Sequence, residues 1–451
     1  MKTQRFPAIY IFIIFLLSGL SELQAQASKK MLYARPHQIS DDSLLTLVQE
    51  RTFQYFWHGA EPVSGLARER YHADDIYPDQ DKHIVTTGGG GFGIMAILVG
   101  IERGFISRKQ GFERLQQITD FLEKADRFHG VWPHWLHGET GKVKPFSKKD
   151  DGGDLVETAF LIQGLLCVRQ YFAQGNDNEK ALSQKIDRLW KDVEWNWHTN
   201  GKNVLYWHWS PNYAWEMNFA VEGYNECLIM YVLAAASPTH TIKPEVYHQG
   251  WARSGGIKGT TEKYGHKLTL KHNDSEEYGG PLFWSHYSFL GLDPRKLKDA
   301  YADYWEHNRN HVLIDWKYCI ENPKNQIGYD ENCWGLTSSY SPGFYAGHKP
   351  GGEDLGVISP TAALSSFPYT PEACMKALKY FYYELGDRIW GEFGFYDAFH
   401  LGLGYYPPRY LAIDQGPIVV MIENHRTGLL WDLFMSCPEV KAGLKKLGFS
   451  Y

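Results

Sequence analysis

Apolar residues recur along the chain with the period of an α-helix, and two kinds of helical segment alternate. Segments 88–104, 154–172 and 216–236 are apolar on nearly every side, which is typical of buried helices. Segments 107–122 and 179–197 carry an apolar stripe and a charged face, which is typical of helices at the surface. The same period predicts further helices at 44–57, 245–252, 281–290, 295–311, 360–367, 372–385 and 417–435.

This alternation of about twelve helices predicts an all-α protein with two concentric rings, an α/α barrel. Buried helices would form the inner ring and amphipathic ones the outer ring. Strand-like alternation is confined to residues 266–271, and no low-complexity linker or internal repeat divides the chain. We therefore expect a single domain over residues 28–451.

The first 27 residues have the features of a signal peptide. Lys2 and Arg5 precede an apolar stretch at 8–20, and Ala25-Gln26-Ala27 supplies the small residues that signal peptidase requires. The stretch is short for a membrane span, so an uncleaved anchor is the less favoured alternative. We expect export, no membrane span after cleavage, and a monomer.

Charge and cysteine content narrow the possible partners. The net charge is −6 and no long basic run is present, so a nucleic-acid partner is not expected. None of the six cysteines lies in a CxxC pair, which argues against zinc or redox chemistry. Buried free thiols are favoured, with a Cys319–Cys333 disulfide as the alternative.

Aromatic residues make up 15% of the chain and gather in loops rich in Gly and Pro. Tyr and Trp offer flat apolar faces with a polar group at one edge, and sugar rings present apolar C–H faces to such surfaces. Long loops on a rigid scaffold commonly carry function. The sequence therefore predicts an oligosaccharide or polysaccharide substrate, contacted by Trp132, Trp135, Trp207, Trp209, Tyr340, Phe344 and Tyr405.

Glycoside hydrolysis needs one protonated carboxyl and one ionised carboxylate at the scissile bond. A first acidic group, Asp150, Asp154 and Glu157, stands at the start of an apolar segment. Asp154 and Glu157 share a helix face, and the helix N-terminus favours negative charge there. An Asp N-cap with Glu three residues later is an equally open interpretation.

Two further acidic groups lie in apolar surroundings. Glu222 and Glu226 are four residues apart in a segment predicted to be helical, and burial would raise their pKa as a general acid requires. Asp397 stands among aromatic residues, and Asp414 precedes an apolar helix that contains the polar run 423–425. Asp414 as a simple helix N-cap is the alternative.

The sequence lacks the motifs of serine hydrolases, zinc proteases and phosphate-binding loops. The chain has no G-x-S-x-G elbow and no H-E-x-x-H motif. The glycines at 88–91 follow no predicted strand and lack the Walker Lys, so we expect them to admit a ligand or a neighbouring backbone. No cofactor and no catalytic metal are expected.

Six runs of the sequence, taken together, resemble the glycoamylase-like domain family. They are 86–93, 131–136, 150–157, 335–341, 395–399 and 412–424. Within that family the chain is similar to the bacterial endo-β-1,2-glucanases of glycoside hydrolase family 144. The resemblance implies an (α/α)₆ barrel that hydrolyses linear β-1,2-glucan to sophoro-oligosaccharides with inversion and without a metal. It also implies the periplasm or exterior of a Gram-negative bacterium.

The resemblance also suggests roles for the acids. Asp150, Asp154, Glu157, Glu226 and Asp414 match acidic positions in the family's cleft motifs. Of the acids, we expect Asp150, Glu222 and Asp397 to contact the substrate. Glu226 is then the expected general acid, and Asp414 or Asp154 the base side. A hydrolase acting on another glucan, an exo-acting sophorohydrolase, and a glycan-binding protein without catalysis remain the alternatives.

Overall fold

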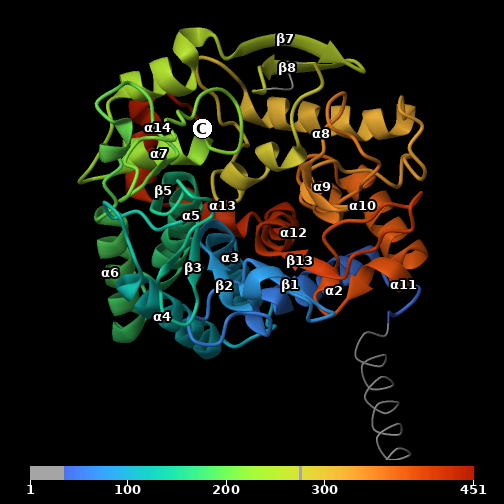
Figure 1. Cartoon of the computed structure of the whole chain (residues 1–451), viewed down its shortest axis with the longest axis horizontal. Coiled ribbons are helices and arrows are strands. Elements are labelled where there is room, and N and C mark those ends of the chain that lie inside the picture. Colours follow the sequence, from blue (N-terminus) through green and yellow to red (C-terminus); the bar gives the residue numbers. More distant parts are fainter. Residues whose placement is uncertain (1–34, 274–276) are drawn as a thin grey trace, which may run out of the picture. The chain divides into compact units, whose positions relative to one another are not determined.

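Helices dominate the computed structural model, which describes residues 35–273 and 277–451 (Figure 1). Residues Leu45–Tyr451 form one compact unit. The predicted signal peptide lies outside the described residues. The α-helices are α2 (Asp41–Trp57), α3 (Thr87–Glu102), α4 (Arg108–Lys124), α5 (Leu155–Phe172), α6 (Asp177–Lys191), α7 (Leu228–Ala236), α8 (Tyr304–Glu321), α9 (Pro360–Leu364), α10 (Pro371–Lys379), α11 (Gly386–Ile389), α12 (Ala412–Arg426), α13 (Leu429–Met435) and α14 (Pro438–Lys446).

The inner ring is built from helices that are buried on all sides. Helix α3 packs against both α5 and α12. Helix α5 also packs against α7, and α12 packs against α9. The short helices η5 (Leu282–Ser285) and η6 (Tyr287–Phe289) complete the ring. η6 packs against α7, and Nε2 of His286 lies 2.9 Å from the Ser366 hydroxyl just after α9. The fold is therefore the predicted all-α (α/α)₆ barrel.

Glycine allows the two central helices to approach closely. A Cβ atom at Gly91 would lie 2.3 Å from the carbonyl oxygen of Phe160, and one at Gly164 would lie 2.3 Å from that of Gly91. Neither contact is sterically possible, so α3 and α5 can touch backbone to backbone only where both lack side chains. The prediction that these glycines admit a neighbouring backbone is confirmed.

The outer helices are amphipathic as predicted. α4 begins with a reciprocal capping box between Ser107 and Gln110, and buries Leu115, Ile118 and Leu122. α6 begins with an equivalent box between Asn176 and Glu179. Such caps satisfy the free backbone N–H groups at a helix start, so these helix boundaries follow directly from the sequence.

Several predicted helix boundaries are wrong. The helix predicted at 179–197 ends at Lys191. Residues 216–227 are irregular, since Asn218 and Gly223 adopt positive φ angles of 46° and 77°, so Glu222 and Glu226 do not share a helix. The segment predicted at 417–435 is two helices, divided by Gly428 at φ 78°. The first of them starts at Ala412, so Asp414 lies in its first turn and is not its N-cap. α8 starts later than predicted, at Tyr304, where Asp303 caps it through the N–H groups of Trp305 and Glu306.

Short strand pairs lead directly into three inner helices. β2 (Ile84–Thr86) runs into α3 and pairs with β3 (Trp135–His137), which pairs with β4 (Val143–Lys144). β5 (Gly153–Asp154) runs into α5 and pairs with β6 (His208–Trp209). β13 (Arg409–Leu411) runs into α12 and pairs with β1 (Arg70–His72). These ladders bring loops from distant parts of the chain to the helix N-termini.

The remaining ladders lie outside this arrangement. β9 (Ser338–Ser341) pairs with β10 (Phe344–Gly347), and β11 (Trp390–Gly391) with β12 (Gly394–Phe395). The predicted strand at 266–271 is confirmed as β8 (His266–Leu270), which pairs with β7 (Lys258–Lys263). All six cysteines are free and buried, as expected. Among the described residues, no helix combines the length and apolarity needed to cross a bilayer.

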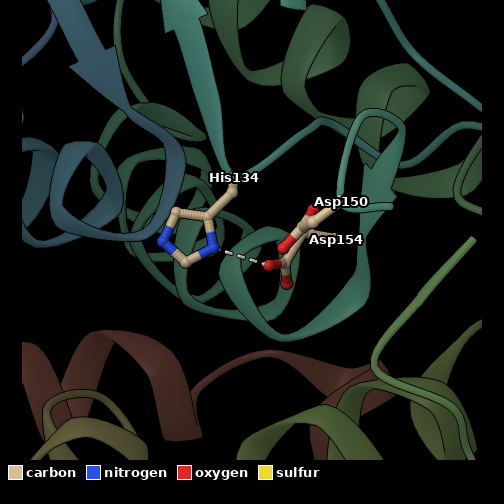
Figure 2. Close-up of side chains that lie close together, drawn as sticks. All are labelled: His134, Asp150 and Asp154. Carbon is tan, nitrogen blue, oxygen red and sulfur yellow. Dashed lines mark hydrogen bonds and ion pairs between the residues drawn. The ribbon is translucent and has the colours of Figure 1, made fainter. Parts of the chain in front are cut away.

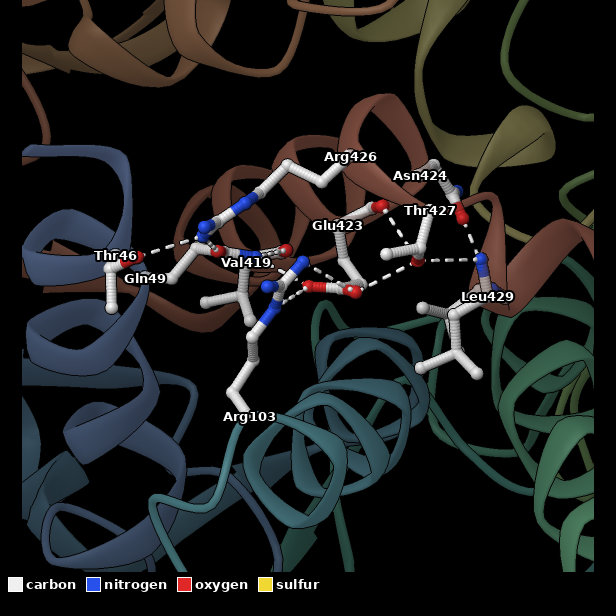
Figure 3. A network of polar contacts seen from close by, with 10 residues as sticks. Thr46, Gln49, Arg103, Val419, Glu423, Asn424, Arg426, Thr427 and Leu429 are labelled. Atoms are coloured by element: carbon white, nitrogen blue, oxygen red, sulfur yellow. Dashed lines mark hydrogen bonds and ion pairs between the residues drawn. The ribbon is translucent and has the colours of Figure 1, made fainter. Parts of the chain in front are cut away.

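The polar run near the end of α12 is structural (Figure 3). The Glu423 carboxylate is 2% exposed and accepts two hydrogen bonds from Arg103, at 2.6 and 3.0 Å. Gln49 and Thr427 also donate to it, while the Asn424 side chain bonds the backbone of Leu290 and Leu430. This network joins α2, α3 and α12 and has no part in the cavity described below.

Candidate active site

A cavity of about 540 Å³ opens at the N-terminal ends of α3, α5 and α12. Its wall combines three carboxyl groups, Glu69, Glu157 and Glu226, with the imidazole of His134. Aromatic rings cover much of the rest. They are Trp135, Phe146, Phe160, Trp207, Phe283, Tyr287, Tyr340 and Tyr345.

Glu157 lies in the first turn of α5 and is 6% exposed. Its Oε2 atom accepts hydrogen bonds from the backbone N–H of Gly88 at 2.8 Å and from the Thr86 hydroxyl at 3.4 Å. A Cβ atom at position 88 would lie 2.5 Å from that oxygen. Gly88 is therefore required for the start of α3 to approach the carboxylate.

Asp154 is the N-cap of α5 and is fully buried. Its Oδ1 atom accepts from the Glu157 N–H at 2.9 Å. Its Oδ2 atom accepts from Nδ1 of His134 at 2.8 Å and from Nε1 of Trp207 at 3.0 Å. Both oxygens are thus occupied by the protein, so Asp154 positions its neighbours and does not face the cavity. The capping interpretation of Asp154 is correct.

His134 lies beside Asp150 and Asp154 (Figure 2). Burial alone would lower its pKa, but Glu157, Asp154 and Asp150 outweigh burial and raise the pKa to about 9. Since Nδ1 is directed at Asp154, the imidazolium is held against the cavity wall at neutral pH.

Glu157 and Glu226 both have pKa values raised to about 7, mainly by burial. For Glu157, the His134 cation and the Gly88 N–H oppose the rise, and the negative charges of Asp154 and Asp150 add to it. For Glu226, the negative charges of Glu157 and Asp154 add to the rise. Of the two, Glu157 has the His134 cation beside it, which favours its ionised form.

Asp150 completes a three-residue cluster with His134 and Asp154. One ligating atom of each lies within 4.8 Å of the others, so the cluster has the donors for a cation. An imidazolium has no lone pair for a metal, however, and Nδ1 is already bonded to Asp154. Burial, followed by the charge of Asp154, raises the pKa of Asp150 to about 6. The donor set therefore fits a hydrogen-bonded ion cluster better than a metal centre.

Asp397 and Asp414 form a buried carboxyl pair behind the cavity wall. They are 2% and 1% exposed, and each carboxyl group affects the pKa of the other, so we expect the pair to hold one shared proton. Asp397 also accepts from the Tyr340 N–H at 2.7 Å, and Asp414 from the Tyr287 hydroxyl at 3.3 Å. Burial raises both pKa values, that of Asp397 to about 6. Neither lines the cavity, so a direct contact of Asp397 with substrate is not supported.

The predicted aromatic contacts divide into two groups. Trp135, Trp207 and Tyr340 line the cavity, and Trp207 stacks on Phe219 with ring centroids 5.3 Å apart. Trp132 is wrong as a substrate contact, because it is fully buried and its Nε1 donates to the Leu122 carbonyl.

The other predicted contacts lie away from the cavity wall. Trp209 packs against His129 and Trp197, and the Tyr405 hydroxyl donates to the Ser341 carbonyl. Phe344 is 54% exposed, and its neighbour Tyr345 lines the cavity in its place. Glu222 is half-buried, and its backbone carbonyl accepts from Arg253.

Sequence reasoning missed His134, Glu69 and Arg70. His134 stands in the Trp-Pro-His-Trp run, where a polar residue among aromatics was an available signal. Glu69 and Arg70 belong to a run of charged residues, a pattern that predicts a solvent-exposed segment. They face the cavity because β1 pairs with β13, and burial raises the pKa of Glu69 although Arg70 is its ion-pair partner. No local sequence pattern predicts that β1 pairs with β13.

Comparison with known proteins shows similarity over almost the whole described chain. A family model described as putative glucoamylase matches residues 218–438. The chain is 68% identical to a solved endo-β-1,2-glucanase from Chitinophaga pinensis, in complex with sophorotriose and glucose. That match covers 92% of this chain and 99% of the other, with a TM-score of 0.91. A solved putative glucoamylase from Bacteroides caccae is 60% identical, covering 91% and 100% of the two chains, with a TM-score of 0.90.

A curated relative from Parabacteroides distasonis, an exo β-1,2-glucooligosaccharide sophorohydrolase acting at the non-reducing end, is 48% identical over 436 residues. The match covers 92% of this chain, and the chain spans 59% of that relative's length. The barrel, the acid-lined cavity and these identities lead to one assignment: the chain belongs to the glycoamylase-like family of glycoside hydrolases, in the group that contains the Chitinophaga pinensis enzyme.

Proposed function

We propose that this protein is a glycoside hydrolase that cleaves linear β-1,2-glucan within the chain and releases sophoro-oligosaccharides. The observation that carries the proposal is a cavity in which Glu157 and Glu226 stand among aromatic rings, with the His134 cation beside Glu157 only of these two acids. The 68% identity to an endo-β-1,2-glucanase supports the choice of linkage.

Glu226 is the proposed general acid. Burial and neighbouring negative charge favour its protonated form at neutral pH, and a protonated carboxyl can donate to the glycosidic oxygen as the bond to the leaving sugar breaks. It lines the cavity, one residue before the N-cap of α7.

Glu157 is the proposed base. Of Glu157, Asp154 and Asp414, only Glu157 lines the cavity. Its carboxylate is held by Gly88 and faced by the His134 cation, which favours the ionised form. In this assignment Glu157 accepts a proton from a water that attacks the anomeric carbon, and the product has inverted configuration. Asp154 and His134 are positioning residues, and Asp414 stabilises the wall behind Tyr287.

The N-terminal segment supports a proposal for location. Lys2, Arg5, the apolar stretch 8–20 and the small residues at 25–27 fit an export signal, so we place the mature protein in the periplasm or outside the cell, as a monomer. Fractionation of cells that express the full chain would test this. Enzyme found only in the cytoplasm, with residues 1–27 intact, would contradict it.

Incubation of the protein with linear β-1,2-glucan, laminarin and starch tests the activity. We expect sophoro-oligosaccharides of several lengths from the first substrate alone, with an early fall in viscosity. A single disaccharide product with slow loss of viscosity would instead identify an exo-acting sophorohydrolase, the activity named for the Parabacteroides relative. Sugar released from starch only would contradict the proposal, and proton NMR of the first-formed anomer would test inversion.

A further inference from the structure

A second hollow, of about 430 Å³, lies outside the catalytic cavity and shares no lining residue with it. We call it the Trp197 hollow. Two tryptophans, Trp197 and Trp215, form its apolar part, with ring centroids 6.3 Å apart. Its other lining residues are Glu194, Asn196, Thr199, Asn200, Gly201 and His240.

Trp197 is unusually accessible for its residue type. Its side chain is 41% exposed, whereas tryptophan is highly buried on average. His129 stacks on one face of the ring at 3.9 Å with an interplanar angle of 14°. His129 therefore covers one face of the ring, and the exposed part is an apolar surface open to a ligand.

Several contacts hold the Trp197 ring and its neighbour His129 in place. His129 adopts a positive φ of 53°, a conformation that only a few per cent of residues other than glycine take, His among the more frequent. Its Nδ1 lies 3.0 Å from Oε2 of Glu194, and the Glu194 N–H donates to the His129 carbonyl at 3.0 Å. Trp209 closes the cluster, 5.0 Å from His129 and 6.4 Å from Trp197. A platform fixed in this way loses little conformational entropy when a ligand binds.

The chemistry of the hollow fits a neutral polyhydroxylated ligand. Among the described residues, no Lys or Arg lines it, and the one carboxylate there, Glu194, faces the His129 imidazole. An anionic ligand therefore finds no cationic partner. Asn196 and Asn200 carry exposed amide groups that can exchange hydrogen bonds with hydroxyls, while the Trp rings can stack on the C–H face of a sugar.

The hollow and the cavity are neighbours along one segment of the chain. Trp207 lines the cavity, and Trp209, at the end of β6, contacts the aromatic cluster of the hollow. Tryptophans only two residues apart therefore reach the two places, so a polymer that occupies the cavity has the hollow nearby.

We infer that the Trp197 hollow is a second carbohydrate-binding site, which holds a neutral β-glucan chain by stacking on Trp197 and Trp215 while another part of the chain occupies the cavity. This inference rests on the proposed function for the identity of the glucan. The site would act only on substrates long enough to reach both places, so its contribution would vanish for the shortest oligosaccharides.

Binding to the Glu226→Gln protein tests the inference, because substrate would not be consumed. Trp197→Ala and Trp215→Ala, each added to Glu226→Gln, should weaken binding of long linear β-1,2-glucan about tenfold, as expected from the loss of one aromatic stacking contact. Binding of sophorotriose should stay unchanged. Tyr451→Ala removes an exposed ring elsewhere, 48% exposed, and is the matched control.

A second variant distinguishes loss of the binding site from loss of the folded structure. Asn196→Arg leaves the rings intact and places a long side chain in the hollow, so it should weaken polymer binding without a change in melting temperature. Unchanged polymer affinity in both Trp197→Ala and Asn196→Arg would overturn the inference. Equal losses for polymer and sophorotriose would overturn it too, since the effect would then come from the cavity.

Failure of the proposed function is a separate outcome. If the wild-type protein does not hydrolyse β-1,2-glucan, the proposed function fails, and the same variants are compared with their parent for binding of laminarin and starch. A selective loss in the Trp197 variants would still support a second site. Binding that is equal in parent and variants, or absent from all glucans, would refute it.

Discussion

The Nδ1 atom of His134 lies 2.8 Å from Oδ2 of Asp154, at the point where β5 passes into α5 (Figure 2). The same carboxylate receives the Trp207 indole N–H and the Glu157 backbone N–H. One buried acid therefore fixes a cation, an aromatic ring of the cavity wall and the first turn of the helix that carries Glu157. The proposed base and its electrostatic partner are positioned by a single side chain.

Glu226→Gln should reduce kcat on linear β-1,2-glucan by about 10³-fold or more, because the amide cannot donate the proton that the leaving oxygen needs. Affinity for sophoro-oligosaccharides should change little, since the two side chains have nearly the same shape. Rates and binding of the purified variant measure both effects. Activity within a factor of three of the wild type would remove Glu226 as the acid.

His134→Gln should move the acidic limb of the kcat/KM profile to higher pH, by about one unit. The imidazolium now lowers the pKa of Glu157, and its loss lets Glu157 take up a proton at higher pH. Trp207→Phe is the matched control, since it removes a hydrogen bond to Asp154 but no charge. A limb that moves equally in both variants would show that His134 acts through geometry alone.

Trp135→Ala should impair substrate binding and Trp132→Ala should reduce stability, although the two residues are close in sequence. Trp135 lines the cavity, so its removal should raise KM while the melting temperature changes little. Trp132 is fully buried, so its removal should cost about 3–5 kcal/mol of stability. Kinetics and thermal unfolding, measured on both proteins, separate the roles. A normal KM in Trp135→Ala would argue against a substrate contact.

The Asp397–Asp414 pair should make stability depend on pH. Burial raises the pKa of Asp397 from 3.8 to about 6, so the folded state binds the proton more tightly than the unfolded state. The resulting stabilisation is present below about pH 4 and is lost as pH rises through about 6. Asp397→Asn should remove this contribution, which would make the fall in melting temperature between pH 4.5 and 7.5 shallower than in the wild type. Parallel curves for the two proteins would contradict the shared proton.

Arg103→Ala should destabilise the fold by about 3 kcal/mol, because it leaves the buried Glu423 carboxylate without its cation (Figure 3). The network is separate from the cavity, so kcat and KM of the folded variant should match the wild type. Denaturant unfolding and initial rates measure the two properties. A change in kcat without loss of stability would assign this network a part in catalysis.

Local sequence pattern was enough to predict the helical fold. The period of apolar residues distinguished inner helices such as α3 from outer ones such as α4, since burial on one face or all faces determines which positions must be apolar. Side chains of Ser107, Asn176 and Asp154 cap helices within three residues. Such short-range interactions are visible in sequence, and so are the acids at 150–157.

Only the tertiary structure decided which polar residues share the cavity. Glu226 was predicted on a helix with Glu222, but the positive φ angle of Gly223 separates the two. Trp132 and Trp135 belong to one aromatic run, yet one enters the core and the other the cavity. Glu69 reaches the cavity because β1 pairs with β13. In that pairing Arg70 lies opposite Leu411, which is hundreds of positions away in the sequence. Composition and period fix how much of each helix is buried, but side-chain direction in loops and strand pairing across the chain depend on packing that no local window contains.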